Sequence, residues 1–289
     1  MELQTKDIVK KVKQIEIRTR RRTEASLMGQ YQSAFKGQGM TFSEVRPYQF
    51  GDEIRRIDWN KTARFREPYV KMMEEERELT VLLVVDISSS MNYGSQHSLK
   101  KEYVAEICAS IGFSAVDNND KVGLILYADK VYKVIPPQKG RKHILTMISL
   151  LLSSEYIASE SNPAVALHYM MNVFKKKSFV FLVSDFNDSI ETKTLRVAGK
   201  KHAMVGIRVA DDKDIQIPDV GYTLFTDSET GKQVWVDTSS ARFRYTFAEE
   251  QKQKQKRVRE EFEAASSGFI SLKTGEDYAK PLVQYFQSR

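Results

Sequence analysis

The chain has 289 residues, of which 41% are hydrophobic and 29% are charged. This length suggests one large domain or two small ones, and the composition is that of a folded protein rather than a disordered one. The formal net charge is +7, with much of the basic excess in residues 10–22 and 252–259. We interpret both segments as solvated helix faces, with a basic patch for an acidic protein partner as the alternative. No motif of a nucleic-acid-binding fold accompanies them, so we expect no nucleic-acid partner.

The sequence contains one cysteine, Cys108, so no intrachain disulfide can form and a reducing compartment fits best. Cys108 falls on a predicted apolar helix face, where we expect a small buried residue rather than a nucleophile. No stretch approaches the roughly 18 apolar residues of a membrane span, and the first residues lack a signal-peptide pattern. We therefore expect a cytoplasmic protein without a transmembrane segment. Peripheral membrane association stays open.

Residues 1–79 predict an N-terminal helix followed by a mixed subdomain of short strands. Apolar residues recur at spacings of four and three between Thr5 and Glu16, which indicates one face of a helix. Residues 18–40 become basic and then Gly-rich, which favours a loop or linker. Residues 41–79 alternate charges of both signs with aromatics, and we expect short strands and turns packed by ion pairs.

Two groups of side chains in this subdomain allow two interpretations each. Asp58 and Trp59 could form an exposed recognition pair, but we expect a buried Trp59 and an ion pair between Asp58 and Arg55 or Arg56. Residues 74–76, three glutamates in a row, could bind a cation. A solvated face or ion pairing with the adjacent arginine explains them better.

From Thr80 the sequence alternates between apolar strands and helices. The run Thr80–Asp86 is apolar up to its final carboxylate, which is typical of a strand buried on both faces of a parallel sheet. The alternation predicts a doubly wound, mostly parallel α/β sheet in a domain over residues 80–289. We expect its further strands at 122–127, 131–135, 178–184, 203–209 and 269–272, and its helices at 98–116, 141–152, 163–174, 191–199 and 278–287.

An elaboration is expected before the last strand. Residues 222–225 and 233–236 read as strands, and Gly231 would turn the chain between them into a β-hairpin. A long polar helix is expected to follow at 241–265. The predicted architecture is therefore a doubly wound domain with a hairpin and helix added near its C-terminal end.

Asp86, Ser88 and Ser90 form a D-x-S-x-S motif where the first buried strand ends. Ligand sites of open α/β sheets lie at the carboxyl ends of the strands, and three oxygens in one tight loop can converge on a hard cation such as Mg²⁺. Because hydroxyls are neutral, such a site leaves the cation seeking an anionic ligand from outside. Asp185 ends a second buried strand and supplies another carboxylate on the same edge, while residues 160–163 form a loop that opens a helix. A simple helix cap is the alternative for the serine-rich turn.

Several further blocks make the sequence resemble one family, the domain of unknown function 58. Its members carry a von Willebrand factor A-like domain, which is a Rossmann-like fold. The resemblance covers roughly residues 5 to 289, and its block around Ile57-Asp58-Trp59 is more specific than the metal motif. The matching blocks are residues 39–48 with Gly51-Asp52, residues 55–60, residues 68–71 leading to 74–77, Asp86-x-Ser88-x-Ser90-Met91, and Ser184-Asp185-Phe186.

The resemblance implies cation binding by Asp86, Ser88, Ser90 and Asp185, and by a hydroxyl of the middle loop, here Ser161. The ion would be Mg²⁺, with Mn²⁺ or Ca²⁺ as alternatives. Similar family members often carry Gly-Thr-Asp in the middle loop, whereas this chain has Glu-Ser-Asn at 160–162. The serine keeps a hydroxyl, but it lacks the methyl group that fixes a threonine rotamer. The loss of the aspartate charge weakens the site and could leave it degenerate.

The family also implies a partner, because such proteins resemble accessory factors encoded beside MoxR-type AAA+ ATPases, which act in chaperoning or maturation of other proteins. We predict a non-enzymatic protein-interaction module whose metal site, of the metal-ion-dependent adhesion type, bridges to a carboxylate of a protein partner. The sequence has no nucleophile elbow, no P-loop and no histidines at ligand spacing, so we assign no catalytic or organic-cofactor residue. Two alternatives are a Mg²⁺- or Mn²⁺-dependent phosphoester hydrolase, for which Asp86 and Asp185 supply few carboxylates, and a scaffold with an empty metal site.

Overall fold

The computed structural model describes the chain except for residues 1–4, 24–38, 77–78, 95–98, 155–160, 189, 227–231 and 288–289. The chain forms two compact units. Unit 1 comprises Met1–Ala34 and Thr80–Arg289, and unit 2 comprises Phe35–Leu79.

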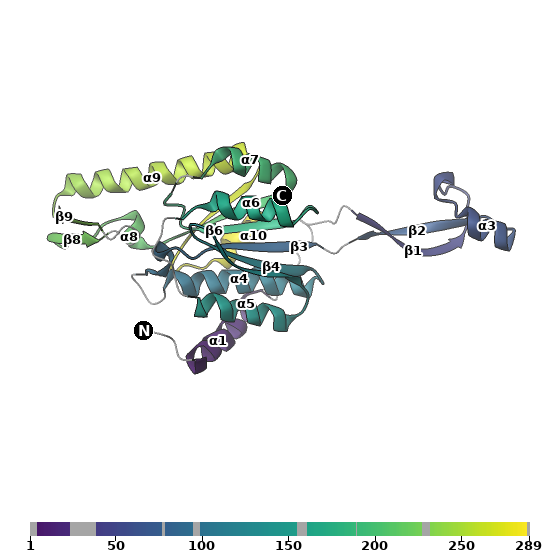
Figure 1. Ribbon diagram of the computed structural model, residues 1–289, viewed down its shortest axis with the longest axis horizontal. Helices are drawn as coiled ribbons and strands as arrows, with labels where there is room; N and C mark the ends of the chain where they lie inside the picture. The colour runs from purple at the N-terminus through teal and green to yellow at the C-terminus, as the bar shows by residue number, and fades with distance from the viewer. Residues whose placement is uncertain are drawn as a thin grey trace. The chain divides into compact units, whose positions relative to one another are not determined.

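Unit 1 is built on a six-stranded sheet in the order β10-β7-β6-β3-β4-β5. All neighbouring strands are parallel except β5, which runs antiparallel to β4 at one edge. This arrangement confirms the predicted doubly wound, mostly parallel sheet (Figure 1). The strands are β3 (Thr80–Asp86), β4 (Lys121–Tyr127), β5 (Val131–Gln138), β6 (Phe179–Ser184), β7 (Ala203–Ala210) and β10 (Gly268–Lys273).

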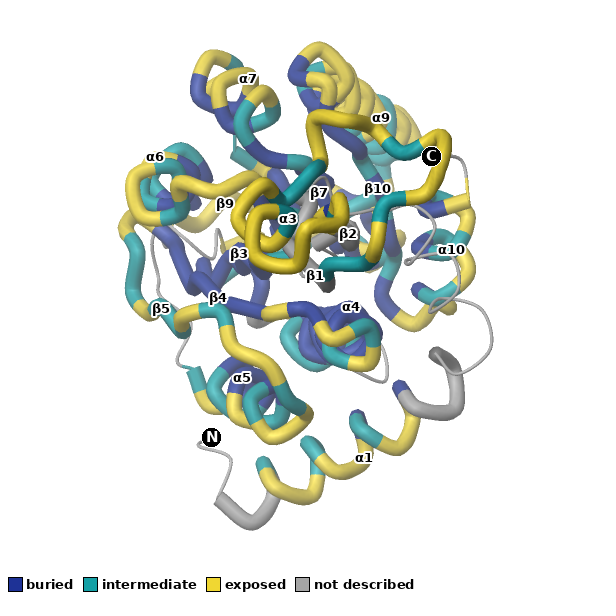
Figure 2. The backbone as a smooth tube through the Cα atoms, turned by 90° about the vertical axis from the view of Figure 1, so that its right-hand side faces the viewer, coloured by how far each residue is buried: buried dark blue, intermediate teal, exposed yellow. Residues whose placement is uncertain are grey.

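Helices cover both faces of the sheet, so that its strands are buried between two layers (Figure 2). One layer holds α4 and α5, with α1 packed on both of them, and Tyr278, directly before α10, is in ring contact with Tyr103 of α4. The other layer holds α6, α7 and α9. The helices of unit 1 are α1 (Thr5–Thr23), α4 (Lys100–Asp117), α5 (Arg141–Ser153), α6 (Pro163–Val173), α7 (Thr192–Lys201), α8 (Asp212–Ile215), α9 (Ala241–Ala264) and α10 (Ala279–Gln287).

The apolar run of β3 explains the centre of this core. Every β3 residue after Thr80 is buried, as expected for a strand covered on both faces. Leu82 and Val84 belong to the cluster shared with α6, α7 and α9, because alternate residues of a strand face the same side. On β7, which lies on the far side of β6 from β3, a side chain at Gly206 would overlap the ring of Phe262, so the glycine allows α9 to approach the sheet.

Helix α1 is longer than the predicted helix at Thr5–Glu16, because residues 18–23, which we predicted as loop, are helical. The rest of that predicted loop, up to residue 38, lies outside the described residues. Ion pairs join Lys11 to Glu102 of α4 and Glu16 to Arg141 of α5. The helix therefore belongs to unit 1, which differs from the predicted grouping of residues 1–79.

Unit 2 is an antiparallel pair of strands, β1 (Gly39–Pro47) and β2 (Tyr69–Glu76), as the short-strand pattern predicted. Between them lie a short 3-10 turn, η1 (Ile54–Arg56), and helix α3 (Trp59–Phe65), which we did not predict. Asp58 begins α3 by accepting hydrogen bonds from the backbone N–H groups of the next turn, and Arg66 ends it in a left-handed conformation with φ of 57°.

A second antiparallel pair, β8 (Tyr222–Thr226) and β9 (Gln233–Asp237), confirms the predicted hairpin. The chain reaches it from the end of β7 through α8, and it continues from β9 into the long helix α9. Figure 1 shows β8, β9 and α8 beyond the end of the sheet at which β7 finishes. Among the helices of the described residues, none is long and apolar enough to cross a membrane.

Candidate metal centre

Asp86 ends the central strand β3 and lies completely buried between the ends of β4 and β6. Its oxygen Oδ1 accepts a hydrogen bond from the backbone N–H of Ser88 at 2.8 Å. Its other oxygen, Oδ2, accepts from the hydroxyls of Ser161 at 2.5 Å and Ser184 at 2.7 Å. The turn after β3, the loop before α6 and the last residue of β6 therefore meet at this one carboxylate.

The described residues that donate hydrogen bonds to Asp86 are all neutral. Among the described residues, no lysine, arginine or histidine forms an ion pair with it. Burial, and then the charge of Asp185, raise the pKa of Asp86 from 3.8 to about 6, while the hydrogen bonds from its serine partners oppose the shift. Buried charges in proteins are usually paired or coordinate a metal. No positively charged side chain of the described residues therefore compensates the carboxylate of Asp86.

Two further hydroxyls of the motif lie side by side. The Oγ atoms of Ser88 and Ser90 are 3.1 Å apart. Ser88 is buried and extended, and the 3-10 turn η2 (Ser89–Asn92) begins directly after it, closed by a hydrogen bond from the N–H of Met91 to the carbonyl of Ser88. This tight turn brings the two serine side chains to the same point, as the D-x-S-x-S spacing predicts.

Asp185 follows β6 and, unlike Asp86, has a positively charged partner. Its Oδ2 lies 3.3 Å from the ammonium of Lys100, and the amide of Asn187 donates to the same oxygen at 2.9 Å. Arg208 donates to its backbone carbonyl at 3.2 Å. Asp185 is 2% exposed, so its charge is compensated inside the protein rather than by water.

Lys100, at the start of α4, is a fully buried cation. Its ammonium lies 2.6 Å from Oδ2 of Asp214 on α8 and donates to the backbone carbonyl of Ser90 at 3.2 Å. Burial disfavours the charged form, but the carboxylates of Asp185 and Asp214 outweigh it and raise the pKa of Lys100 above 10.5. The ammonium of Lys100 therefore contacts the serine turn, the residue after β6 and helix α8 at the same time.

The structure brings the five predicted residues, Asp86, Ser88, Ser90, Ser161 and Asp185, to one edge of the sheet. We expected Ser161 to coordinate through its hydroxyl, whereas here this hydroxyl donates to Asp86. Of the rest of the middle loop, Asn162 caps α6 through the N–H of Ala164 at 3.2 Å, and residue 160 lies outside the described residues.

Four residues of this edge, Ser184, Lys100, Asp214 and Tyr127, were not predicted as part of it. Ser184 could have been found, since it directly precedes Asp185 in the matching block. Lys100 and Asp214 carry no sequence signal, because a lysine at a helix start and an aspartate in a polar loop are usually solvated. Tyr127 is also fully buried here, and burial, followed by the charge of Asp86, raises its pKa well above 10.0.

The donors fit a hard divalent cation. Serine hydroxyls and carboxylates are oxygen ligands that suit Mg²⁺. Within the described part of the chain no group of three His, Cys, Asp or Glu side chains could hold a metal ion, so the serine hydroxyls would have to supply part of the ligand set. The buried and unpaired charge of Asp86 lies beside the hydroxyl pair of Ser88 and Ser90.

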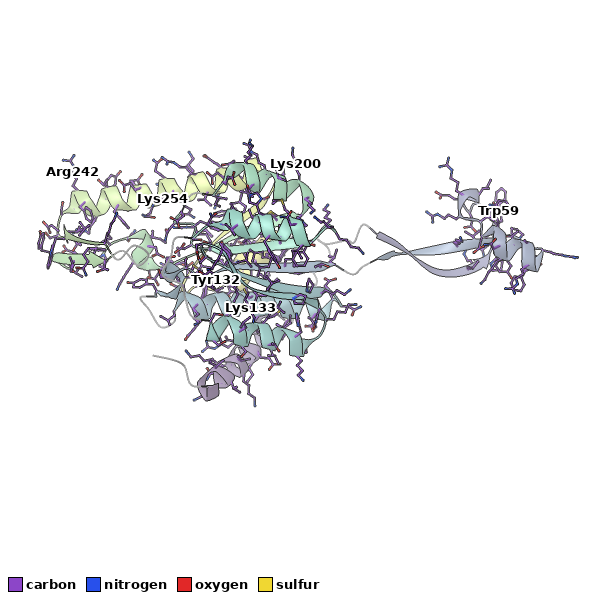
Figure 3. All side chains as sticks on the ribbon, viewed as in Figure 1. Trp59, Tyr132, Lys133, Lys200, Arg242 and Lys254 are labelled. Atoms are coloured by element: carbon purple, nitrogen blue, oxygen red, sulfur yellow. The ribbon has the colours of Figure 1, made fainter. Side chains whose placement is uncertain are left out.

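The expectation that Trp59 is a buried anchor is wrong. Its side chain is 66% exposed on α3 (Figure 3), and Asp58 caps this helix and lies 3.9 Å from Lys71 instead of pairing with Arg55 or Arg56. The glutamates at 74–76 lie in β2, and their side chains are outside the description. The expectation for Cys108 is confirmed, since it is buried.

The strand order, read from the antiparallel edge as β5-β4-β3-β6-β7-β10, is the doubly wound order in which a ligand site falls at the end of the first central strand. With a D-x-S-x-S turn at that point and one antiparallel edge strand, unit 1 is a von Willebrand factor A-like domain. The chain belongs to the family described as "Protein of unknown function DUF58", whose model matches residues 44–257.

Relatives and solved structures were also found. The chain is 27% identical over 280 residues to "Uncharacterized protein Rv1480" of Mycobacterium tuberculosis, with 95% of this chain and 87% of that protein covered. Among solved structures, an aerotolerance-related membrane protein from Bacteroides fragilis NCTC 9343 is similar at 15% identity and a TM-score of 0.48, over 73% of this chain and 100% of that one. The SpRpn10 VWA domain is similar at 11% identity and a TM-score of 0.39, over 71% of this chain and 94% of that one.

Proposed function

We propose that this chain is a non-enzymatic protein-interaction module that binds a divalent cation, most readily Mg²⁺, at Asp86, Ser88, Ser90 and Asp185. We call the edge of the sheet formed by these four residues the docking edge. The observation that carries the proposal is the completely buried carboxylate of Asp86, whose hydrogen-bond donors among the described residues are all neutral. Its position beside two converging hydroxyls is where a cation would compensate this charge.

The charges around the site favour an anionic partner. Lys100 and Arg208 place two positive charges beside Asp185 and Asp214, so Asp86 alone remains to neutralise a divalent cation. When bound, the ion would supply a Lewis-acidic contact for a carboxylate from outside. Ser88 and Ser90 would offer neutral oxygens, while Ser161 and Ser184 hold the Asp86 carboxylate in place.

The proposed partner is a MoxR-type AAA+ ATPase, which the family resemblance suggests, and an acidic side chain of this protein would reach the docking edge. We place this activity in the cytoplasm, because the single cysteine is a free, buried thiol as expected in a reducing compartment.

Cation binding can be tested by titrating Mg²⁺ into the full chain in a calorimeter. We expect Ser90→Ala to weaken Mg²⁺ binding at least about tenfold, because a ligand is lost. The neighbouring Ser89→Ala is the matched control and should bind as the wild type does. Absence of saturable binding of Mg²⁺, Mn²⁺ or Ca²⁺ to the wild-type chain would reject the metal site.

Partner binding can be tested with a purified MoxR-type ATPase by biolayer interferometry. We expect binding in magnesium buffer, with a large loss in EDTA and in Asp86→Asn. Binding that is indifferent to both changes would leave the partner but remove the metal bridge.

The prediction that the chain is not an enzyme stays a prediction. The described residues give no observation that favours phosphoester hydrolysis, since Asp185, the second carboxylate, is held by Lys100. Turnover of p-nitrophenyl phosphate with Mg²⁺ or Mn²⁺ that disappears in Ser90→Ala but persists in Ser89→Ala would establish the hydrolase instead.

A further inference from the structure

The β8–β9 hairpin exposes large apolar side chains on both of its faces. Tyr222, Leu224 and Trp235 share one face, and Phe225 and Val234 lie opposite each other on the other face. All five are exposed, with Tyr222 at 69% and Trp235 at 59%. An isolated two-stranded hairpin is marginally stable in water, and exposed apolar patches mark interaction sites. The hairpin therefore has the composition of a contact surface.

The rings of Tyr222 and Trp235 are already arranged for contact. Their centroids are 5.3 Å apart and their planes differ by 8°, so the two rings stack. Tyrosine and tryptophan contribute most to binding hot spots, and side chains that are ordered before binding lose little entropy on it. The stacked pair is the centre of the proposed contact.

The base of the hairpin is tied to the rest of unit 1. The hydroxyl of Thr238 donates to the carbonyl of Gly221 at 2.7 Å and closes the base. Arg244 of α9 donates to the carbonyl of Thr238 at 2.6 Å and pairs with Asp219 at 3.1 Å. Side-chain contacts therefore attach the base of the hairpin to α9 and to the segment before β8, in addition to the backbone connections.

Helix α8 connects the hairpin to the docking edge. Helix α8, which precedes the hairpin, carries Asp214, and Lys100 joins this carboxylate to Asp185. On the exposed side of the same helix, the ammonium of Lys213 lies 5.7 Å from the ring of Tyr93, which follows the Ser89–Asn92 turn. The hairpin and the proposed metal site thus lie at the same end of the sheet, and α8 contacts the residues beside the serine turn through Asp214 and Lys213.

We infer that the β8–β9 hairpin is the second half of the docking surface and takes the apolar side chains of an acidic segment of a protein partner. The carboxylates of this segment would reach the docking edge and Lys213, and its aliphatic or aromatic side chains would pack on Tyr222 and Trp235. The preference for acidic residues rests on the proposed function, whereas the apolar contact rests on the hairpin itself.

The test uses labelled synthetic peptides and the full chain in magnesium buffer, measured by fluorescence polarisation. The probe is a peptide in which Asp alternates with Leu and Phe, compared with one that has Lys for Asp and one that has Ser for Leu and Phe. We expect saturable binding of the first peptide and at least about tenfold weaker binding of the other two. Failure of the first peptide to bind saturably would overturn the inference.

The decisive variant is the double substitution Tyr222→Ser/Trp235→Ser, which should weaken binding of the acidic apolar peptide at least about tenfold while Mg²⁺ affinity and the circular dichroism spectrum stay unchanged. Trp59→Ser, which removes an equally exposed tryptophan from unit 2, is the matched control and should bind normally. Peptide binding by the double variant that equals the wild type would overturn the inference, even if Mg²⁺ binds.

Three further measurements separate the remaining outcomes. A chain that binds no Mg²⁺ but still loses peptide binding in the double variant would remove the proposed metal function and keep the hairpin contact. Binding to phosphatidylserine vesicles that only the wild type shows would identify a membrane contact and overturn the inference. Self-association in sedimentation velocity that the double variant abolishes would do the same in favour of a second copy.

Discussion

The ammonium of Lys100 lies 3.3 Å from the carboxylate oxygen Oδ2 of Asp185, with both side chains almost completely buried. The same ammonium is 2.6 Å from Asp214. Removal of one partner from a buried ion pair leaves an uncompensated charge in a low-dielectric environment, which is costly. The stability of unit 1 should therefore depend on this lysine far more than on a solvated one.

We expect Lys100→Met to lower the free energy of unfolding by about 3–5 kcal/mol, measured by urea denaturation in EDTA. The adjacent Lys101→Met is the control, because the Lys101 side chain is less buried and its ammonium donates a hydrogen bond to the carbonyl of Ser154 at 2.7 Å. This substitution should cost about 1 kcal/mol. Equal losses of unfolding free energy in the two variants would mean that the buried ion pairs of Lys100 stabilise the protein no more than Lys101 does.

His202 should make the stability of the folded protein sensitive to acid. Burial, and to a lesser degree the charge of Lys201, lower its pKa from 6.5 to about 4. Its Nδ1 accepts from the N–H of Ser178 at 3.2 Å, while its buried Nε2 has no hydrogen-bond partner among the described residues. Protonation would place a charge where little can stabilise it, so the unfolded chain takes up a proton first as the pH falls.

The stability that neutral His202 provides is present above pH 6.5 and should be lost as the pH falls towards 4. From pH 7 to pH 4.5 the free energy of unfolding of the wild type should fall by on the order of 2 kcal/mol more than that of His202→Gln. Urea denaturation of both proteins at each pH measures this difference. The remaining acid-sensitive groups are common to both proteins and cancel. Parallel pH profiles for the two proteins would contradict the expected role of His202.

Cys108 should be chemically silent in the native protein. Burial raises the pKa of its thiol from 9.0 to about 12, so almost no thiolate forms at pH 8. We expect its reaction with Ellman's reagent to be limited by unfolding of the protein and to become rapid in urea, with one thiol per chain. Rapid labelling without denaturant would show that α4 opens readily.

Trp59 should matter little for folding, in spite of its size. We expect Trp59→Ala to change the opening free energy of unit 2 by no more than about 0.5 kcal/mol, because its side chain is exposed. Val70 on β2 is 2% exposed and is the contrast, with an expected loss of about 1–3 kcal/mol in Val70→Ala. Hydrogen exchange of the β2 amides measures both losses within unit 2 alone. A larger loss for Trp59 than for Val70 would contradict the exposed placement.

The fold was predictable where the signal was local. Apolar runs such as Thr80–Asp86 announce strands buried on both faces, and their alternation with helical periods is enough for the topology. The motif spacing likewise predicted that Asp86, Ser88 and Ser90 share one turn, and the strand ends predicted that Asp185 reaches the same edge.

The features that the sequence did not predict depend on contacts between segments far apart in the chain, or on one helix-capping residue. Lys100 meets Asp185 and Asp214 only after the sheet has formed, and no periodicity encodes this meeting. Helix α3 has seven residues and begins at the cap of Asp58, which is too short for a hydrophobic period to reveal. Residue type alone also misplaced Trp59, since large aromatics are buried more often than they are exposed.

Unit 2 begins and ends within the chain of unit 1, since Met1–Ala34 and Thr80–Arg289 together form one compact body. Such an insertion is tethered at both ends and shares no strand with its host. A chain in which a short Gly-Ser linker replaces residues 35–79 should therefore retain α1 against α4 and α5 and fold around the same sheet. We therefore expect that unit 2 of one family member can be exchanged for that of another without loss of the sheet of unit 1.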